Sequence, residues 1–244
     1  MYKSFDDPPM TPPAETAWLG LARTRGFLSR LPDALVASLV KGAQRVEYPA
    51  GTIGLRWEES PKAAIVLRGT LRSFISFPDG SQVTTRYLKA GDMTGVFASR
   101  QPALARGVQA IDRSELLFIG GERMKEISLA EPRFAWALIE ELTTVLNSNQ
   151  RALYIRAFGS VRLRVVSAIV DRVRASGGLR AGRKVQGTQH ELAIAVGSVR
   201  EVVASILSAL KHEGVIDVHR GEVTILDPDR LAREAQALVG NPVD

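Results

Sequence analysis

The chain has 244 residues, of which 45% are hydrophobic and 24% charged, the balance of an ordinary globular protein. The lack of cysteine excludes disulfides, thiolate zinc sites, iron–sulfur clusters and thiol switches. No apolar run reaches the roughly 18 residues that span a bilayer, and the first ten residues lack the basic and apolar parts of a signal peptide. We therefore expect a cytoplasmic protein without a membrane contact.

The net charge of +6 is distributed unevenly. Residues 151–200 contain ten arginines and lysines against two acids, whereas residues 201–244 have a net charge of −4. A concentrated basic segment is typical of a protein that binds a polyanion. A solvated helix surface would produce the same composition, so the charge alone leaves both interpretations open.

The N-terminal part of the chain predicts a proline-rich leader, a short helical segment and then strands. Residues 1–17 contain four prolines and few apolar side chains, which is typical of a flexible leader. Residues 16–42 favour two short helices that are interrupted near Leu31 and Pro32.

From about Val46 the pattern changes to short alternating runs separated by glycine-rich turns. The run Thr70–Phe77 has Leu71, Ile75 and Phe77 on one face, and a Pro-Asp-Gly turn joins it to a returning strand at Val83–Leu88. Several such strands in succession indicate a sandwich or barrel over residues 18–131.

A long helix is predicted from Pro132, a residue that suits a first helical turn, to residue 157. It would be about 39 Å long at 1.5 Å per residue. Gaps of three and four separate the members of a heptad seam: Ile139, Leu142, Leu146, Asn149 and Leu153. Such a seam favours a dimer, in which a polar Asn149 can set the register, but packing on the core of the same domain is the alternative.

Two short helices are predicted beyond a break at residues 157–160 and a further helix at Val161–Arg174, which Ser160 can cap. Thr188 to Glu191 forms a capping box that starts the first of the pair, with Leu192, Ala195 and Val196 as its apolar face. Gly197 suits the tight turn that follows.

Ser198 to Glu201 predicts a second capping box and therefore a second helix. One side of this helix is expected to be buried through the apolar residues Val199, Val202, Val203, Ile206, Leu207 and Leu210. The opposite side presents Arg200, Glu201, Ala204 and Ser205. This arrangement is a helix-turn-helix, in which the first residues of the second helix contact base edges in the major groove.

Arg200 and Glu201 are the predicted base-reading residues. An arginine can bond guanine O6 and N7 in a bidentate pair, and a glutamate can accept from cytosine N4. The alternatives are a surface charge for Arg200 and a capping role alone for Glu201.

Residues 214–226 predict two strands around His219, Arg220 and Gly221, which form a wing. Candidate phosphate contacts, which position a protein without reading sequence, are His219 and Arg220 at the wing tip together with Gln189, His190 and Ser198. Ordinary turn residues are the alternative. The winged helix-turn-helix domain is expected over residues 158–232 and a C-terminal tail over residues 233–244.

The order of elements resembles that of the Crp/Fnr family of bacterial transcription regulators. The residues that carry the resemblance are the run Tyr87–Gly95 and, more specifically, the run Gly197–Leu207. The resemblance covers about residues 18–226 and implies an α+β fold. An N-terminal double-stranded β-helix (jelly-roll-like) sensor domain would be followed by a dimerisation helix at 132–157 and a winged helix-turn-helix.

The resemblance also implies partners: a second copy of the chain, a palindromic DNA site, a small-molecule effector between roll and helix, and RNA polymerase if the protein activates transcription. In the family, positions equivalent to Arg200 and Glu201 read the half-site, and an arginine commonly follows where this chain has Ser205. We therefore expect a half-site that is relaxed or altered at one base.

The expected effector pocket departs from the cyclic-nucleotide pattern of the family. Val96 follows Gly95 where those members have a glutamate, and the later Arg-Ser pair is missing, with Arg106 nearby. Asn149 and Gln150 replace the usual Thr-Ser pair. All three histidines lie beyond residue 189, so the roll has no histidine for haem. We expect no cofactor, and either an unknown effector or none.

Two other classes of protein are alternatives. A cupin-like enzyme needs metal-binding histidines in the roll, which has none, so we expect no enzymatic activity. An architectural DNA-binding protein with a vestigial roll fits the basic segment, but Arg200 and Glu201 at a helix start favour a sequence-specific regulator.

Overall fold

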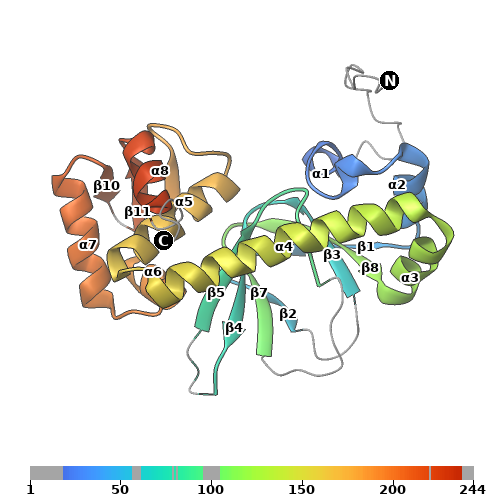
Figure 1. Cartoon of the computed structure of the whole chain (residues 1–244), viewed down its shortest axis with the longest axis horizontal. Coiled ribbons are helices and arrows are strands. Elements are labelled where there is room, and N and C mark those ends of the chain that lie inside the picture. Colours follow the sequence, from blue (N-terminus) through green and yellow to red (C-terminus); the bar gives the residue numbers. More distant parts are fainter. Residues whose placement is uncertain are drawn as a thin grey trace, which may run out of the picture.

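The computed structural model describes residues 19–56, 62–78, 80, 82–95, 105–219 and 221–237. The predicted leader at residues 1–17 lies outside this part. A long helix, α4 (Pro132–Phe158), joins an N-terminal β-sheet body to a C-terminal, mainly helical body (Figure 1).

Two four-stranded antiparallel sheets form the N-terminal body and confirm the expected jelly-roll-like domain. The first contains β1 (Gln44–Tyr48), β8 (Ser114–Gly120), β3 (Lys62–Arg68) and β6 (Met93–Thr94), in that order. The second contains β2 (Ile53–Arg56), β7 (Ala105–Ala110), β4 (Leu71–Ser76) and β5 (Gln82–Leu88), in that order.

Strand β3 is apolar along most of its length because both of its faces are buried. Ala64 and Val66 face the core between the two sheets, whereas Ile65 and Leu67 belong to a second core beneath the helices. In that second core the ring of Phe27 packs edge-on against Phe134 of α4, with centroids 5.6 Å apart. The start of α4 is thereby fixed to the roll.

The predicted hairpin exists, and strands β4 and β5 pair as expected. Their register shifts where Thr85 of β5 has no Cα partner, so the bulge lies in β5, whereas β4 pairs with β7 without a shift. Of the three side chains expected on one face of β4, Leu71 is buried in the core between the sheets and Phe77, beyond the end of the strand, is 41% exposed.

Short helices cover the first sheet: α1 (Leu21–Thr24), a 3-10 turn η2 (Leu28–Arg30), α2 (Asp33–Val40) and α3 (Gly121–Ala130). The break between η2 and α2 falls at Leu31 and Pro32, as predicted. Helix α3 was not predicted, because the Gly120-Gly121 pair at its start resembles a turn.

The C-terminal body contains α5 (Val161–Ala175), α6 (Gln189–Val196), α7 (Arg200–His212) and α8 (Pro228–Gln236). A small sheet places β11 (Glu222–Ile225) between β10 (Ile216–His219) and β9 (Lys184–Gln186). Strand β9 was not predicted. Helix α8 runs past the expected domain end at residue 232, and Ala235 is buried in the core of this body, so residues 233–236 belong to this body and not to the expected tail.

Candidate nucleic-acid interface

The first helix of the motif, α6, has the predicted capping residues at both of its ends. The Thr188 side chain accepts a hydrogen bond from the Glu191 amide, and the Glu191 carboxylate accepts one from the Thr188 amide, which completes the capping box. Gly197 ends α6 in the left-handed conformation, with φ 60° and ψ 56°. Helix α7 follows at 109° to α6, within the range expected for a helix-turn-helix.

The predicted second capping box is absent, which is a correction. Helix α7 begins at Arg200 with Val199 as its N-cap residue, and no side chain caps it. Glu201 is therefore the second helical residue instead of the third, out of position to bond back to Ser198. Within the described part of the chain, the Glu201 side chain has no hydrogen bond or ion pair, so its carboxylate is free to accept one from a base.

The exposed edge of α7 contains the predicted base-reading residues. Arg200, Glu201 and Ser205 are exposed at its N-terminal end. The expectation that Val199 and Val202 are buried was wrong, because they are 59% and 40% exposed. The helix instead buries a narrower stripe that consists of Val203, Leu207 and Leu210.

Val199 and Val202 are therefore candidate contacts that the sequence analysis missed. An apolar side chain in the major groove can pack against the methyl group of thymine. The signal that could have revealed them is their position beside Arg200 and Glu201 at the start of α7.

The candidate phosphate contacts lie on three segments. Arg200 Nε donates to Gln189 Oε1 over 3.4 Å, which brings the starts of α6 and α7 together. His190 is exposed in the first turn of α6, and Ser198 is half-buried in the turn. His219 is exposed at the end of β10, and Arg220 lies outside the described residues.

The basic segment 151–200 divides into structural and exposed members, so only part of it is available to a polyanion. Arg172 is 4% exposed and lies 3.7 Å from Glu191. Arg162 joins α5 to α7 and α8 through carboxylates: hydrogen bonds to Glu213 at 2.7 Å and to Glu234 at 2.5 Å. These bonds raise the pKa of Arg162.

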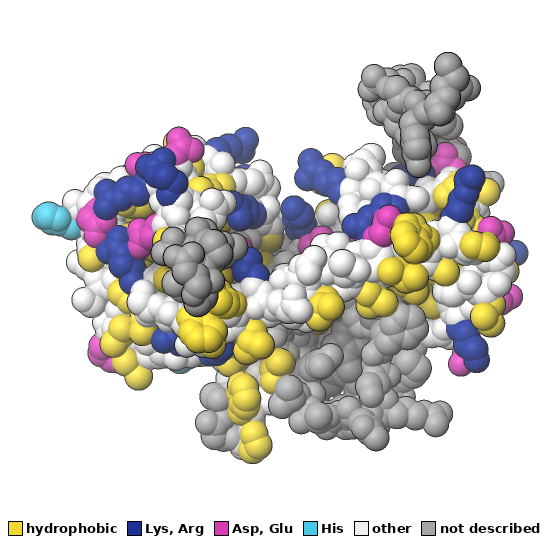
Figure 2. Space-filling view, in the orientation of Figure 1, with side chains coloured by type: hydrophobic (Ala, Val, Ile, Leu, Met, Phe, Trp, Pro, Cys, Tyr) yellow, Lys and Arg dark blue, Asp and Glu magenta, His cyan; other side chains and the backbone are white. Residues whose placement is uncertain are grey.

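The predicted dimer seam lies on the surface of the molecule. Four of its apolar members are 37% to 68% exposed, namely Ile139, Leu142, Leu146 and Leu153. Trp136, 63% exposed, extends the same stripe toward the start of α4, and Figure 2 shows hydrophobic side chains spaced along this helix. The opposite face of α4 packs on the roll through Phe134, Ala137 and Leu138. The helix therefore has a core-facing side and an exposed apolar side.

The predicted effector-pocket residues are spread over several places. Gly95 follows β6 with φ 79°, and Asn149 and Gln150 are exposed on α4. Val96 and the Arg106 side chain lie outside the described residues.

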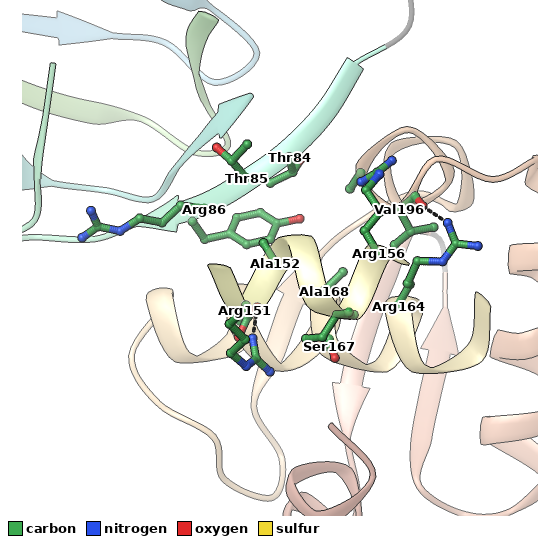
Figure 3. Close-up of a pocket in the computed structure, with 14 residues that line it drawn as sticks. Thr84, Thr85, Arg86, Arg151, Ala152, Arg156, Arg164, Ser167, Ala168 and Val196 are labelled. Atoms are coloured by element: carbon green, nitrogen blue, oxygen red, sulfur yellow. Dashed lines mark hydrogen bonds and ion pairs between the residues drawn. The ribbon is translucent and has the colours of Figure 1, made fainter. Parts of the chain in front are cut away.

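The structure has a pocket at another place, the junction of the two bodies (Figure 3). It is lined by β5, the end of α4, α5 and the end of α6. Its volume is about 490 Å³, which includes the part that is open to solvent. Gly95, Asn149 and Gln150 do not line it.

The described part of the chain contains no group of three or more histidine, aspartate or glutamate side chains that could hold a metal ion. No single helix there is long and apolar enough to cross a membrane, although the bent pair α6 and α7 meets that criterion jointly by length and composition.

The geometry defines a class of protein: a regulator with a jelly-roll domain, a connecting helix and a winged helix-turn-helix that binds DNA. Residues 163–234 match the Crp-like helix-turn-helix domain. This match and the relatives below support the Crp/Fnr family of transcription regulators.

Two curated relatives are similar over most of the chain. The CRP-like cAMP-activated global transcriptional regulator of Mycobacterium tuberculosis is 27% identical over 88% of this chain and 98% of its own length. The cyclic AMP receptor protein of Thermus thermophilus is 28% identical over 80% of this chain and 89% of its own.

Two solved structures share the fold. The c-di-GMP responsive regulator CLP of Xanthomonas campestris has a TM-score of 0.68 at 20% identity, covering 80% of this chain and 99% of its own. A Crp/Fnr-family regulator of Thermus thermophilus has a TM-score of 0.63 at 23% identity, covering 79% of this chain and 98% of its own.

Proposed function

We propose that this chain acts as a homodimer that recognises a palindromic DNA site, with α7 of each copy in a major groove. The observation that carries the proposal is the start of α7, where Arg200 and Glu201 are exposed side by side and the Glu201 carboxylate has no partner among the described residues. An exposed carboxylate beside an arginine at a helix N-terminus suits a cytosine–guanine step.

The dimer is supported by the exposed apolar stripe on α4, defined as Trp136, Ile139, Leu142, Leu146 and Leu153. Leaving several large apolar side chains in water is unfavourable, and a second copy of the same helix would cover them. A two-fold axis that relates two copies of α4 also relates the two recognition helices, and a palindromic DNA site has the same symmetry.

We also propose that the roll does not hold a cyclic nucleotide in the manner of cAMP-dependent family members. Val96 stands where their glutamate would accept a hydrogen bond from the ribose, and an isopropyl group cannot do so.

Arg200→Ala tests sequence reading. Loss of one bidentate guanine contact should cost about 1–3 kcal/mol per half-site on cognate DNA, with a much smaller loss on random duplex. Fluorescence anisotropy with a selected palindrome and with random DNA at one salt concentration measures both. Lys211→Ala is the matched control, because Lys211 is an exposed basic residue in the last turn of the same helix.

An equal loss on both duplexes would favour the architectural alternative, since contacts to phosphate carry no sequence information. Cognate binding that falls as far in Lys211→Ala as in Arg200→Ala would show that charge on α7, and no base contact, is responsible.

A further inference from the structure

Two apolar side chains lie at the start of the recognition helix α7 without contributing to the core. Val199 is 59% exposed and Val202 is 40% exposed. Among the described residues, neither belongs to the hydrophobic core that Val203, Leu207 and Leu210 of the same helix enter. The packing of the C-terminal body therefore does not explain why these two positions are apolar.

Val199 also occupies a position at which valine is disfavoured. It is the N-cap residue of α7, with an extended backbone at φ −90° and ψ 153°, and its side chain caps nothing. Serine, threonine, aspartate or asparagine at an N-cap accepts a hydrogen bond from one of the first helical amides, which valine cannot do. The start of α7 therefore has an apolar side chain where a polar one would stabilise the helix.

The two valines are neighbours on one edge of the helix. The side chain of an N-cap residue lies beside the third helical residue, which is the geometry that lets a polar N-cap bond the amide there. Val202 is the third residue of α7. Both side chains are β-branched and have few rotamers, so they form a small, stiff apolar surface, which we call the valine patch.

The valine patch and Arg200 lie on opposite sides of Glu201. An α-helix has 3.6 residues per turn, so successive residues are about 100° apart around its axis. Arg200 and Val202 are the residues directly before and after Glu201 in α7. When the Glu201 carboxylate accepts from a cytosine, Arg200 therefore extends to one side of that base pair and the valine patch to the other.

The major groove offers few apolar groups to such a patch. The base edges present hydrogen-bond donors and acceptors, together with the C5-methyl group of thymine. A cytosine methylated at C5 has the same group at the same place on its ring. Valine would leave a donor or acceptor without a partner, which costs free energy, whereas a methyl group loses nothing by the contact. The patch therefore favours a pyrimidine that has a C5-methyl group.

We propose that the valine patch recognises the C5-methyl group of a pyrimidine in the base pair next to the one that Glu201 contacts, on the side away from Arg200. This inference rests on the proposed function and adds one position to the predicted half-site. Thymine and 5-methylcytosine share the recognised chemistry, and the experiment below distinguishes them.

A selected palindrome in which thymines are replaced one position at a time by deoxyuridine tests the proposal. Uracil pairs with adenine as thymine does and lacks only the methyl group. At one position in each half-site, the affinity of the wild-type protein should fall about fourfold, the value for one buried methyl-sized group. Methylating the cytosines at C5, also one position at a time, is the second arm. A rise of similar size would identify 5-methylcytosine as the source. Fluorescence anisotropy at one salt concentration measures both arms.

The double variant Val199→Ala/Val202→Ala should bind the duplexes with and without the methyl group equally. A merely structural role of the valines would weaken binding to both duplexes and leave their ratio at the wild-type value. Leu226→Ala is the matched control, because Leu226 is 48% exposed in the same body and lies outside α7. It should keep the wild-type ratio.

A methyl effect in either arm that the double variant loses supports the proposal. A wild-type protein that is indifferent to the methyl group at every position, or an effect that persists in the double variant, overturns it. Arg200→Ala should weaken binding to the palindrome and keep the methyl ratio. A wild type that prefers the palindrome to random DNA but ignores the methyl groups overturns this proposal alone. Equal binding of the palindrome and random DNA would overturn the proposed function as well.

Discussion

Gly197 occupies the most constrained backbone position in the interface. Its left-handed conformation would cost an L residue about 1–2 kcal/mol, and it lies against the Arg156 guanidinium. We expect Gly197→Ala to lower the free energy of unfolding by that amount, as measured by urea denaturation. The Arg156 guanidinium must also move away from the added methyl group, so the loss should exceed that at a glycine with open space around it.

Gly214→Ala is the matched control. Gly214 also has a positive φ, 71°, but no atom lies within 4 Å of a Cβ built on it. Its substitution should cost the backbone strain alone, which is a smaller loss of stability than in Gly197→Ala. Equal losses in the two variants would mean that the contact between Gly197 and Arg156 contributes nothing to stability.

At the scale of a single element, the apolar stripe of α4 predicts that a charge placed within it will separate the dimer. Leu146 is 56% exposed, so Leu146→Glu should leave the fold of each copy intact while it introduces two like charges into the dimer seam. Sedimentation velocity should show a shift from dimer to monomer. Far-ultraviolet circular dichroism should remain unchanged.

Thr144→Glu adds the same charge to the same helix, at an exposed position outside the stripe. It should remain dimeric. A dimeric Leu146→Glu protein, or a monomeric Thr144→Glu protein, would place the dimer contact elsewhere on the chain.

Elements with local signals could be predicted from the sequence. The capping box at Thr188, Pro132 at the start of α4 and the glycine turn each depend on residues a few positions apart, and the structure contains all three. Helix α3 and strand β9 have no such signal. The bulge in β5, where Thr85 has no partner on β4, was not predicted, because alternation alone does not reveal an extra residue.

The interface was predictable in part for the same reason. The order of helix, glycine and helix is local, so the exposed start of α7 followed from it. The exposure of Val199 and Val202 did not, because the helix begins one residue later than a capping box would set it. The junction pocket combines residues from β5, α4, α5 and α6, which are distant in sequence, and no periodicity reveals such a combination.

At the scale of the whole molecule, α4 joins the roll and the dimer stripe to the body that contains α7 (Figure 1). Within a dimer this connection would fix the distance between two recognition helices. Successive major grooves on one face of DNA are about 34 Å apart, so a rigid dimer tolerates only one half-site spacing.

Inserting about 5 bp between the half-sites turns the second one to the opposite face of the duplex, half a helical turn away. Binding should then fall to the level of a single half-site, measured by anisotropy, whereas an insertion of equal length outside the palindrome should have no effect. Leu146→Glu protein should bind both spacings equally, because separate copies carry no fixed distance between them. Wild-type binding that is indifferent to the insertion would mean that the two DNA-binding bodies act independently of α4, and the role of this helix in setting half-site spacing would be lost.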